Sequence, residues 1–245
     1  MEIAIKTNDL TKEYKDIVAV NKLNLEINDG ELFSLLGVNG AGKTTTIKML
    51  STLTKPTSGN AYIYDLDINK DQDKIKELID ISMQETAIAR KLTVEENIEF
   101  YAKLSGQSKD EIEETKKNVY EAFELDKVAK KQSSKLSGGW QRKLSIALAL
   151  VSKPKVLFLD EPTLGLDVLA RRELWKTIES LKGKMTIILT THYMEEAEAL
   201  SDRIGIMKDG KLLFVGTKEE LFSKTNKNSV EEAFINIVSG GDLDE

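Results

Sequence analysis

Apolar and polar residues alternate over two short stretches near the start of the chain. Residues 3–5 and 23–27 show this alternation, which is typical of strands that bury one face. Asn28-Asp29-Gly30 then indicates a turn. Residues 31–36 are mostly apolar and predict a short strand that leads directly into glycine-rich sequence.

The apolar spacing changes from strand to helix after Thr44. The apolar residues that recur at helical spacing and define one face are Ile47, Leu50 and Leu53. This helix should end before Pro56, because proline disfavours helical geometry in the residue that precedes it.

The pattern from residue 92 to residue 153 is largely helical. Thr93 and Glu96 fit a capping box, which predicts a helix start. A charged helix is expected over 110–123 and an apolar one over 141–153.

Two further strands, 156–160 and 185–190, flank a predicted helix over 168–182. This strand–helix–strand order predicts parallel strands in a covered sheet. The preceding helical stretch is then an insertion into one α/β core.

Composition narrows the class of protein. The 245 residues include 40% hydrophobic and 31% charged residues, as in ordinary globular proteins. The absence of cysteine excludes disulfides and thiolate metal sites. A net charge of −6 argues against a general nucleic-acid binder. No uncharged apolar run approaches the roughly 18 residues of a membrane span, and the N-terminus lacks a signal-peptide pattern.

The glycine-rich sequence matches the phosphate-loop pattern G-x-x-x-x-G-K-[ST] in full. It reads Gly37-Val38-Asn39-Gly40-Ala41-Gly42-Lys43-Thr44, with Thr45 following. Such a loop points its N–H groups, and the N-terminus of the next helix, at phosphate oxygens. We expect Lys43 to reach the β- and γ-phosphates of a nucleotide and the Thr44 hydroxyl to ligate Mg²⁺. A chance glycine turn is disfavoured by the strand before it and the helix after it.

Two acidic residues end the apolar strand 156–160. Asp160 is placed to hold Mg²⁺, as the aspartate at such a strand end does in phosphate-loop NTPases. Glu161 is then placed to polarise the attacking water. Two solvated carboxylates would be the alternative if the phosphate loop were absent.

Leu136-Ser137-Gly138-Gly139 lies shortly before that strand, where its N–H groups would form an anion site without a lysine. Ser137 is expected to cap a helix beginning near Gln141. Together with the phosphate loop and the acidic strand end, this segment resembles the signature of the ATP-binding-cassette (ABC) ATPases. The resemblance covers residues 3–217.

The resemblance implies an α/β fold with a phosphate-loop core, a mainly parallel sheet, an N-terminal antiparallel β subdomain and an inserted helical subdomain. One domain is expected over 1–238. Its parts would be a core with the β subdomain (1–84 and 154–217), the helical insertion (85–153) and C-terminal helices (218–238), followed by an acidic tail (239–245).

The resemblance also assigns roles to four other residues. Tyr14 would stack on adenine, although a packing tyrosine is the alternative. Gln84, at the end of the predicted strand 78–83, would contact Mg²⁺ or the attacking water. His192, the only histidine, would contact the γ-phosphate and orient water with Glu161. Asp167 would cross a dimer interface.

In the ABC arrangement, Ser137, Gly138 and Gly139 close over the γ-phosphate that the partner's phosphate loop holds. The resemblance therefore implies a head-to-tail dimer with an identical or closely related chain. One position departs from the family pattern, because Trp140 stands where the signature has glutamine, and glutamine is displaced to Gln141.

The sequence further resembles the drug- and sodium-export (ABC-2) type of ABC ATPase in residues 161–167, 191–197 and 230–234. We expect an ATP-hydrolysing subunit that powers export of a drug, ion or lipid-like substrate through separate permease subunits. A groove near Gln84 and residues 85–105 would receive a permease helix. The chain would then be cytoplasmic and peripheral to the membrane.

Two other readings stay open. The first is a non-transport ABC ATPase. Repair types need a longer insertion, and translation types usually carry two cassettes, so the iron–sulfur assembly type is the hardest of these to exclude. A regulatory module that binds ATP without hydrolysing it is the other, although every expected catalytic position is occupied.

Overall fold

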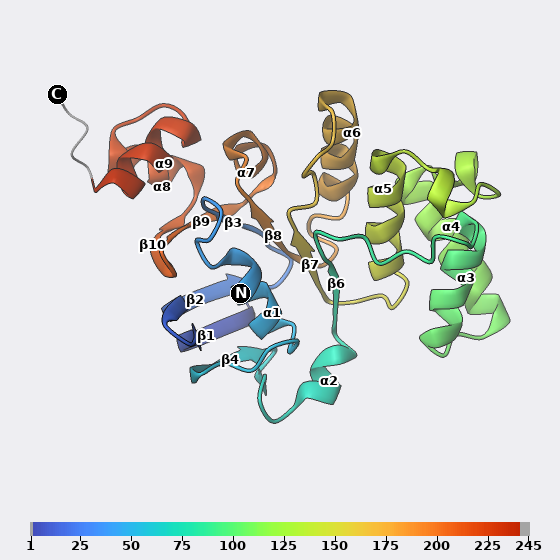
Figure 1. The fold of residues 1–245 in the computed structure, drawn as a ribbon, viewed down its shortest axis with the longest axis horizontal. Helices are drawn as coiled ribbons and strands as arrows, with labels where there is room; N and C mark the ends of the chain where they lie inside the picture. Colours follow the sequence, from blue (N-terminus) through green and yellow to red (C-terminus); the bar gives the residue numbers. More distant parts are fainter. Residues whose placement is uncertain (1, 241–245) are drawn as a thin grey trace.

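An antiparallel sheet forms the N-terminal part of the chain in the computed structural model, which describes residues 2–240 (Figure 1). Its order is β2-β1-β4-β5. The strands are β1 (Ile3–Tyr14), β2 (Ile17–Asn28), β4 (Ser58–Ile63) and β5 (Leu66–Asp67). β1 and β2 extend well beyond the predicted stretches, because their outer faces keep charged residues in solvent while their inner faces stay buried.

A second, mainly parallel sheet lies beside the first and has the order β10-β9-β3-β8-β7-β6. Only the outermost pair, β10 and β9, is antiparallel. Its strands are β3 (Leu32–Leu36), β6 (Ile79–Ser82), β7 (Val156–Asp160), β8 (Thr186–Thr191), β9 (Arg203–Lys208) and β10 (Lys211–Gly216). β3, β7 and β8 are buried at every position, which explains why their sequences do not alternate between apolar and charged residues.

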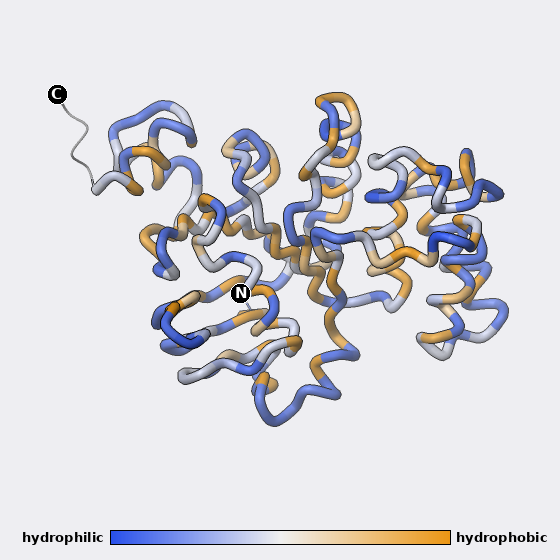
Figure 2. Tube along the Cα trace, in the orientation of Figure 1, coloured by the Kyte–Doolittle hydropathy of each residue, from blue (hydrophilic) through white to orange (hydrophobic). Residues whose placement is uncertain are grey.

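Alternate residues of β7 face two different cores. Leu157 and Leu159 pack into a cluster with the helices, whereas Val156 and Phe158 pack into a cluster with the antiparallel sheet. The hydropathy colours show the apolar residues gathered along these central strands (Figure 2). The helices around the core are α1 (Lys43–Leu50), α2 (Gln72–Lys76), α6 (Val168–Glu179), α7 (Met194–Leu200), α8 (Lys218–Thr225) and α9 (Val230–Ser239).

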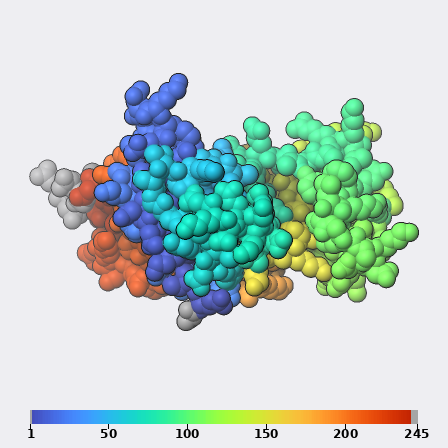
Figure 3. Space-filling view, turned by 90° about the horizontal axis from the view of Figure 1, so that it is seen from below, coloured from blue at the N-terminus to red at the C-terminus, as the bar shows by residue number. Residues whose placement is uncertain are grey.

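The segment between β6 and β7 is helical and lies to one side of the sheets. It contains α3 (Val94–Leu104), α4 (Lys109–Phe123), two 3-10 turns (Leu125–Val128 and Ser133–Lys135) and α5 (Gly138–Ala149). Seen from below, α3 and α4 stand apart from the rest of the molecule as a lobe (Figure 3). The predicted capping box of Thr93 and Glu96 is present. The α/β class and the mainly parallel sheet are confirmed.

Several predicted ends were wrong by a few residues. α1 ends at Leu50 because Thr52 takes a left-handed φ of 61°, so Leu53 lies beyond the helix and is 60% exposed. α5 begins at Gly138 rather than Gln141 and ends at Ala149 rather than Lys153, which has a φ of 54° before Pro154.

The helix predicted over 168–182 ends at Glu179. The predicted tail is also displaced, since α9 includes Ser239 and Gly240 is its C-cap, while residues 241–245 lie outside the described part. Within residues 2–240, no helix combines the length and the apolar character that crossing a membrane requires.

Candidate functional site

The glycine-rich loop joins β3 to α1 and packs backbone against backbone. Gly42, the N-cap of α1, has a φ of 104°. A Cβ there would lie 2.4 Å from the Ala19 carbonyl oxygen, and one at Gly37 would lie 2.5 Å from the Met207 carbonyl oxygen. The first turn of α1 carries no acidic residue, so its N–H groups offer a site to an anion.

Lys43 is the first residue of α1, and its side chain is buried. Its Nζ donates to the Gly37 and Val38 carbonyl oxygens at 2.7 and 3.2 Å. The same ammonium lies 3.3 Å from Oε1 of Glu161. A phosphate in the loop would compete with the two carbonyl oxygens for the ammonium, because its charged oxygens accept stronger hydrogen bonds than neutral carbonyls do.

Asp160 ends β7 and is fully buried beneath the loop. Its Oδ1 accepts hydrogen bonds from the hydroxyls of Thr44, at 3.0 Å, and Thr190, at 2.6 Å. Its Oδ2 has no hydrogen-bond partner within residues 2–240. A buried carboxylate oxygen with no donor, next to a threonine hydroxyl, fits a hard cation such as Mg²⁺, which prefers oxygen ligands. No group of three or more His, Cys, Asp and Glu in the described part could hold a metal by itself.

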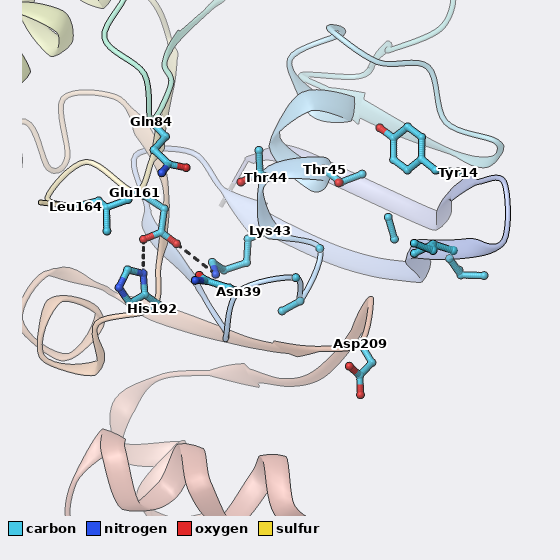
Figure 4. Close-up of a pocket in the computed structure, with 16 residues that line it drawn as sticks. Tyr14, Asn39, Lys43, Thr44, Thr45, Gln84, Glu161, Leu164, His192 and Asp209 are labelled. Carbon is cyan, nitrogen blue, oxygen red and sulfur yellow. Dashed lines mark hydrogen bonds and ion pairs between the residues drawn. The ribbon is translucent and has the colours of Figure 1, made fainter.

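Glu161 leaves the strand direction with a left-handed φ of 50°. Its Oε2 lies 2.6 Å from Nδ1 of His192, and Oε1 faces Lys43 (Figure 4). The backbone N–H of Glu161 donates to Thr190, which fixes this turn at the C-terminal ends of β7 and β8. One carboxylate therefore bridges the lysine and the histidine that the sequence separates by about 150 residues.

An open hollow of about 740 Å³ connects these groups with Tyr14 and Gln84. Tyr14 lies at one end of the hollow and the Glu161–His192 pair at the other, with Lys43 between them (Figure 4). The loop contributes Asn39, Gly40, Ala41, Gly42, Lys43, Thr44 and Thr45 to the lining. A volume of this size is in the range of small-molecule sites.

The signature residues lie elsewhere on the chain. Ser137 and Gly139 line a separate small hollow, and neither lines the one that contains the phosphate loop. Ser137 occupies the N-cap of α5, but its side chain makes no capping hydrogen bond, contrary to the prediction. Asp167 caps α6 by accepting from the N–H groups of Leu169 and Ala170.

Trp140 and Gln141 both have partners within the chain. Trp140 packs against the core shared with the helices, and Nζ of Lys143 lies 5.0 Å from its ring centroid. Gln141 reaches backward, and its Nε2 donates to the Leu136 carbonyl oxygen at 3.0 Å. The displaced glutamine therefore stabilises the turn that leads into the signature.

Arg142 was missed by the sequence reasoning. It is buried in α5 and donates to the carbonyl oxygens of Met83, Asp160, Glu161 and Pro162 at 2.5–3.2 Å. Burial lowers its pKa to about 10. The signal available in the sequence was a charged residue inside the apolar 141–153 stretch. In the structure, Arg142 joins α5 to the strand end that carries Asp160 and Glu161.

Glu196 is a second buried charge that the sequence did not reveal. It lies in α7, is fully buried, and accepts a hydrogen bond from Nε1 of Trp175 at 2.9 Å. Burial raises the pKa of Glu196, and the nearby Glu161 carboxylate raises it further.

A protein-family model described as "ABC transporter" matches residues 20–164. This chain belongs to the ABC transporter family. The phosphate loop, the 136–139 segment and the acidic strand end all lie within the matched region. The family that these motifs indicated is therefore confirmed, and the chain is an ABC ATPase domain.

This ABC ATPase domain is similar to curated proteins from bacteria and eukaryotes. It is 37% identical over 247 residues to the probable multidrug ABC transporter ATP-binding protein YbhF of Escherichia coli (strain K12), covering 98% of this chain and 43% of that protein. It is 43% identical over 217 residues to the phospholipid-transporting ATPase ABCA3 of Homo sapiens, covering 87% of this chain and 13% of that protein. The chain therefore spans less than half the length of these relatives.

Solved ABC structures share the fold over nearly the whole chain. An ATP-binding subunit of an ABC transporter superposes with a TM-score of 0.85 at 26% identity, covering 96% of this chain and 99% of that one. A dimeric ATP-binding cassette in a post-hydrolysis state, bound to ADP and Pi, gives a TM-score of 0.78 at 28% identity, covering 87% and 98%. These likenesses confirm the ABC ATPase fold.

Proposed function

We propose that this ABC ATPase domain hydrolyses ATP as one half of a head-to-tail dimer and powers export through separate membrane subunits. The observation that carries the proposal is the Glu161 carboxylate, which contacts both Lys43 and His192 at one end of the hollow. A carboxylate held there is placed to accept a proton from water that attacks a γ-phosphate.

ATP binding would begin with an exchange of partners at Lys43. The phosphates enter the loop and draw the Lys43 ammonium away from the Gly37 carbonyl oxygen and from Glu161. Tyr14, at the far end of the hollow, offers its ring to the adenine. Glu161 then keeps His192 as its partner and turns toward the γ-phosphate.

The Thr44 hydroxyl and the free oxygen of Asp160 would hold Mg²⁺, with Gln84 at the edge of the same hollow. When bound, Mg²⁺ neutralises charge on the β- and γ-phosphates. The hydroxyl of Thr190 keeps Asp160 oriented by its 2.6 Å hydrogen bond.

Hydrolysis would then use groups that are already in place. Water attacks the γ-phosphorus, the bond to the bridging oxygen of ADP breaks, and Glu161 accepts the proton that the water loses. His192 holds the Glu161 carboxylate during this transfer through its 2.6 Å contact. The products are ADP and phosphate, as in the dimeric cassette that this chain resembles.

The position of the signature supports a dimer, because this segment lies away from the phosphate loop of its own chain. Ser137 and Gly138 are exposed, and the signature lies outside the hollow that would hold the nucleotide. In a head-to-tail pair, Ser137, Gly138 and Gly139 of one chain would cover the γ-phosphate held by the other, with Asp167 at the interface. The backbone N–H groups supply the contact, so Trp140 does not prevent it.

A protein partner is supported by apolar side chains near the Gln84 segment. Phe100 and Leu104 on α3 are 46% and 70% exposed. We propose that a helix of a permease covers them and holds the chain at the cytoplasmic face of a membrane. The likeness to YbhF, a probable multidrug transporter protein, supports export. The domain division into core, helical insertion 85–153 and C-terminal helices is part of the same proposal.

The proposal is tested by Glu161→Gln, which keeps the shape of the side chain and removes its basicity. We expect at most about one hundredth of the wild-type turnover and a dimer that ATP stabilises in size-exclusion chromatography. Glu195→Gln, the same change at an exposed position of α7, serves as the control and should retain full turnover. Near-normal turnover in Glu161→Gln would remove that residue from its proposed role.

A further inference from the structure

Two segments that border the proposed site are hydrogen-bonded to each other. One runs from Gln84 to Thr93, and the other runs from residue 129 to Leu136, directly before Ser137. Two backbone hydrogen bonds join them, Ser133 N to Leu92 O and Ser134 N to Arg90 O, at 2.9 and 3.0 Å. Two more, Val94 N to Lys131 O and Glu95 N to Ala129 O at 3.1 and 3.0 Å, join the start of α3 to the second segment. The segment that begins at Gln84 is therefore joined to the segment that leads into the signature.

Asn97 lies at the junction, on the first turns of α3, and is fully buried. Its Oδ1 accepts from the Ala89 N–H at 2.8 Å. Its Nδ2 lies 3.1 Å from the Ala89 carbonyl oxygen, 2.8 Å from that of Thr93 and 2.9 Å from Oγ of Ser133. One side chain thus contacts both segments and the helix that carries it.

Only a primary amide satisfies this set of partners. It offers one acceptor to the Ala89 N–H and two N–H donors to the surrounding oxygens. A carboxylate would face these oxygens without a proton, and an alkyl side chain would leave buried polar groups unpaired at about 1–3 kcal/mol each.

The contacts continue from Asn97 to the signature. Nε2 of Gln141 lies 3.4 Å from the carbonyl oxygen of Ser133 and 3.0 Å from that of Leu136. On the other side, the Tyr101 hydroxyl donates to the Ala87 carbonyl oxygen at 2.7 Å, which ties the Gln84 segment to α3. Hydrogen bonds thus join residues 87–92 to residues 133–136, and Gln84 is connected to them only through the chain.

We propose that Asn97 is a positioning residue whose buried amide fixes the Gln84 segment relative to the signature segment, and that turnover depends on this amide. The inference rests on the proposed ATP hydrolysis in a dimer. It assigns the alignment of these two segments to one buried side chain, Asn97.

The first test compares Asn97→Ala with Gln107→Ala. Gln107 is a matched control, because its amide also bridges segments of the helical region: Nε2 donates to the Val151 carbonyl oxygen at 2.7 Å, and Oε1 accepts from Thr115 at 2.8 Å. Asn97→Ala should lower kcat about 10- to 100-fold, with KM and single-chain ATP affinity unchanged. Gln107→Ala should lower the melting temperature but keep kcat. Equal kcat in the two variants, or a loss confined to ATP affinity, would overturn the proposal.

Ser133→Ala is a milder variant in case Asn97→Ala does not fold. It removes a single acceptor of Asn97 at a fully buried position and introduces no bulk. Its kcat should lie between those of wild type and Asn97→Ala, and Ser133→Thr, which keeps the hydroxyl, should recover part of the loss. Wild-type kcat in Ser133→Ala would count against the route through this contact.

A distance measurement tests the contact of Asn97 with the two segments independently of ATP turnover. The chain has no cysteine, so cysteines at exposed Glu85 and Ser134 can carry a pair of spin labels. Wild type should give one narrow distance distribution, and Asn97→Ala should give a broad one. An unchanged distribution overturns the proposal even if the protein hydrolyses ATP. A wild-type chain without ATPase activity would instead refute the proposed function and leave this measurement valid.

Discussion

At the residue scale, two adjacent carboxylates differ in backbone conformation and therefore in the groups that they contact. Asp160 and Glu161 look alike in sequence, but Asp160 stays in the strand and is buried against two hydroxyls. Glu161 takes a left-handed backbone and reaches Lys43 and His192. The different backbone conformations give the two carboxylates different partners, two buried hydroxyls for Asp160 and a lysine and a histidine for Glu161.

Glu196 provides a prediction at the same scale. Its pKa is raised above the ordinary 4.5, chiefly by burial. As the pH rises above about 4.5, the unfolded chain loses this proton first, so the free energy of unfolding falls until Glu196 also ionises in the folded state. Glu196→Gln keeps the acceptor for Trp175 and removes the charge, so it should be more stable than wild type near pH 8 by about 1 kcal/mol.

Denaturant unfolding between pH 4 and pH 8 would measure this difference. The two proteins should converge at the acidic end, where Glu196 is protonated in both states. Glu198→Gln, the same change at a less buried position of the same helix, is the control. A Glu196→Gln protein that is less stable than wild type near pH 8 would contradict the prediction.

At the scale of elements, the phosphate loop lies so close to β2 that side chains larger than glycine do not fit at position 42. Gly42→Ala would place a Cβ 2.4 Å from the Ala19 carbonyl oxygen at a φ of 104°. Gly106→Ala has a similarly positive φ of 75° but open space around it, so it should cost only about 1–2 kcal/mol. Gly42→Ala should cost more and weaken ATP binding by at least about ten-fold.

Thermal unfolding and nucleotide titration of both glycine variants provide the measurement. Normal ATP affinity in Gly42→Ala would show that the loop adjusts at no cost to the site.

The ends of elements were harder to predict than their existence, because the backbone conformation of single residues decides where a helix stops. The left-handed residue Thr52 stops α1, whose apolar spacing alone would let it continue.

At the scale of the whole molecule, the separation of the signature from the phosphate loop predicts a shared site. Ser137→Arg should abolish turnover, because the added cation and bulk occupy the place of the partner's γ-phosphate. ATP binding by the single chain should stay within about two-fold of wild type, since Ser137 lies outside the nucleotide hollow.

Mixing two inactive variants tests directly whether two chains share one site. In a mixed dimer of Ser137→Arg and Lys43→Ala, one composite site keeps an intact Lys43 from one chain and an intact Ser137 from the other. Turnover should return on mixing, whereas each variant alone stays inactive. Full turnover by Ser137→Arg alone would contradict a site completed by the partner's signature.

The sequence by itself determined the α/β class and the family, and it indicated several residues that line the hollow, among them Tyr14, Gln84 and His192. It could do so because the phosphate loop, the acidic strand end and their spacing are local patterns with a fixed chemistry. Tertiary structure decided what spacing does not encode. The meeting of Glu161 with His192, the four carbonyl oxygens around Arg142 and the oxygens around Asn97 join segments that are far apart in the chain. Such contacts depend on how strands and helices pack, and packing is a property of the whole fold.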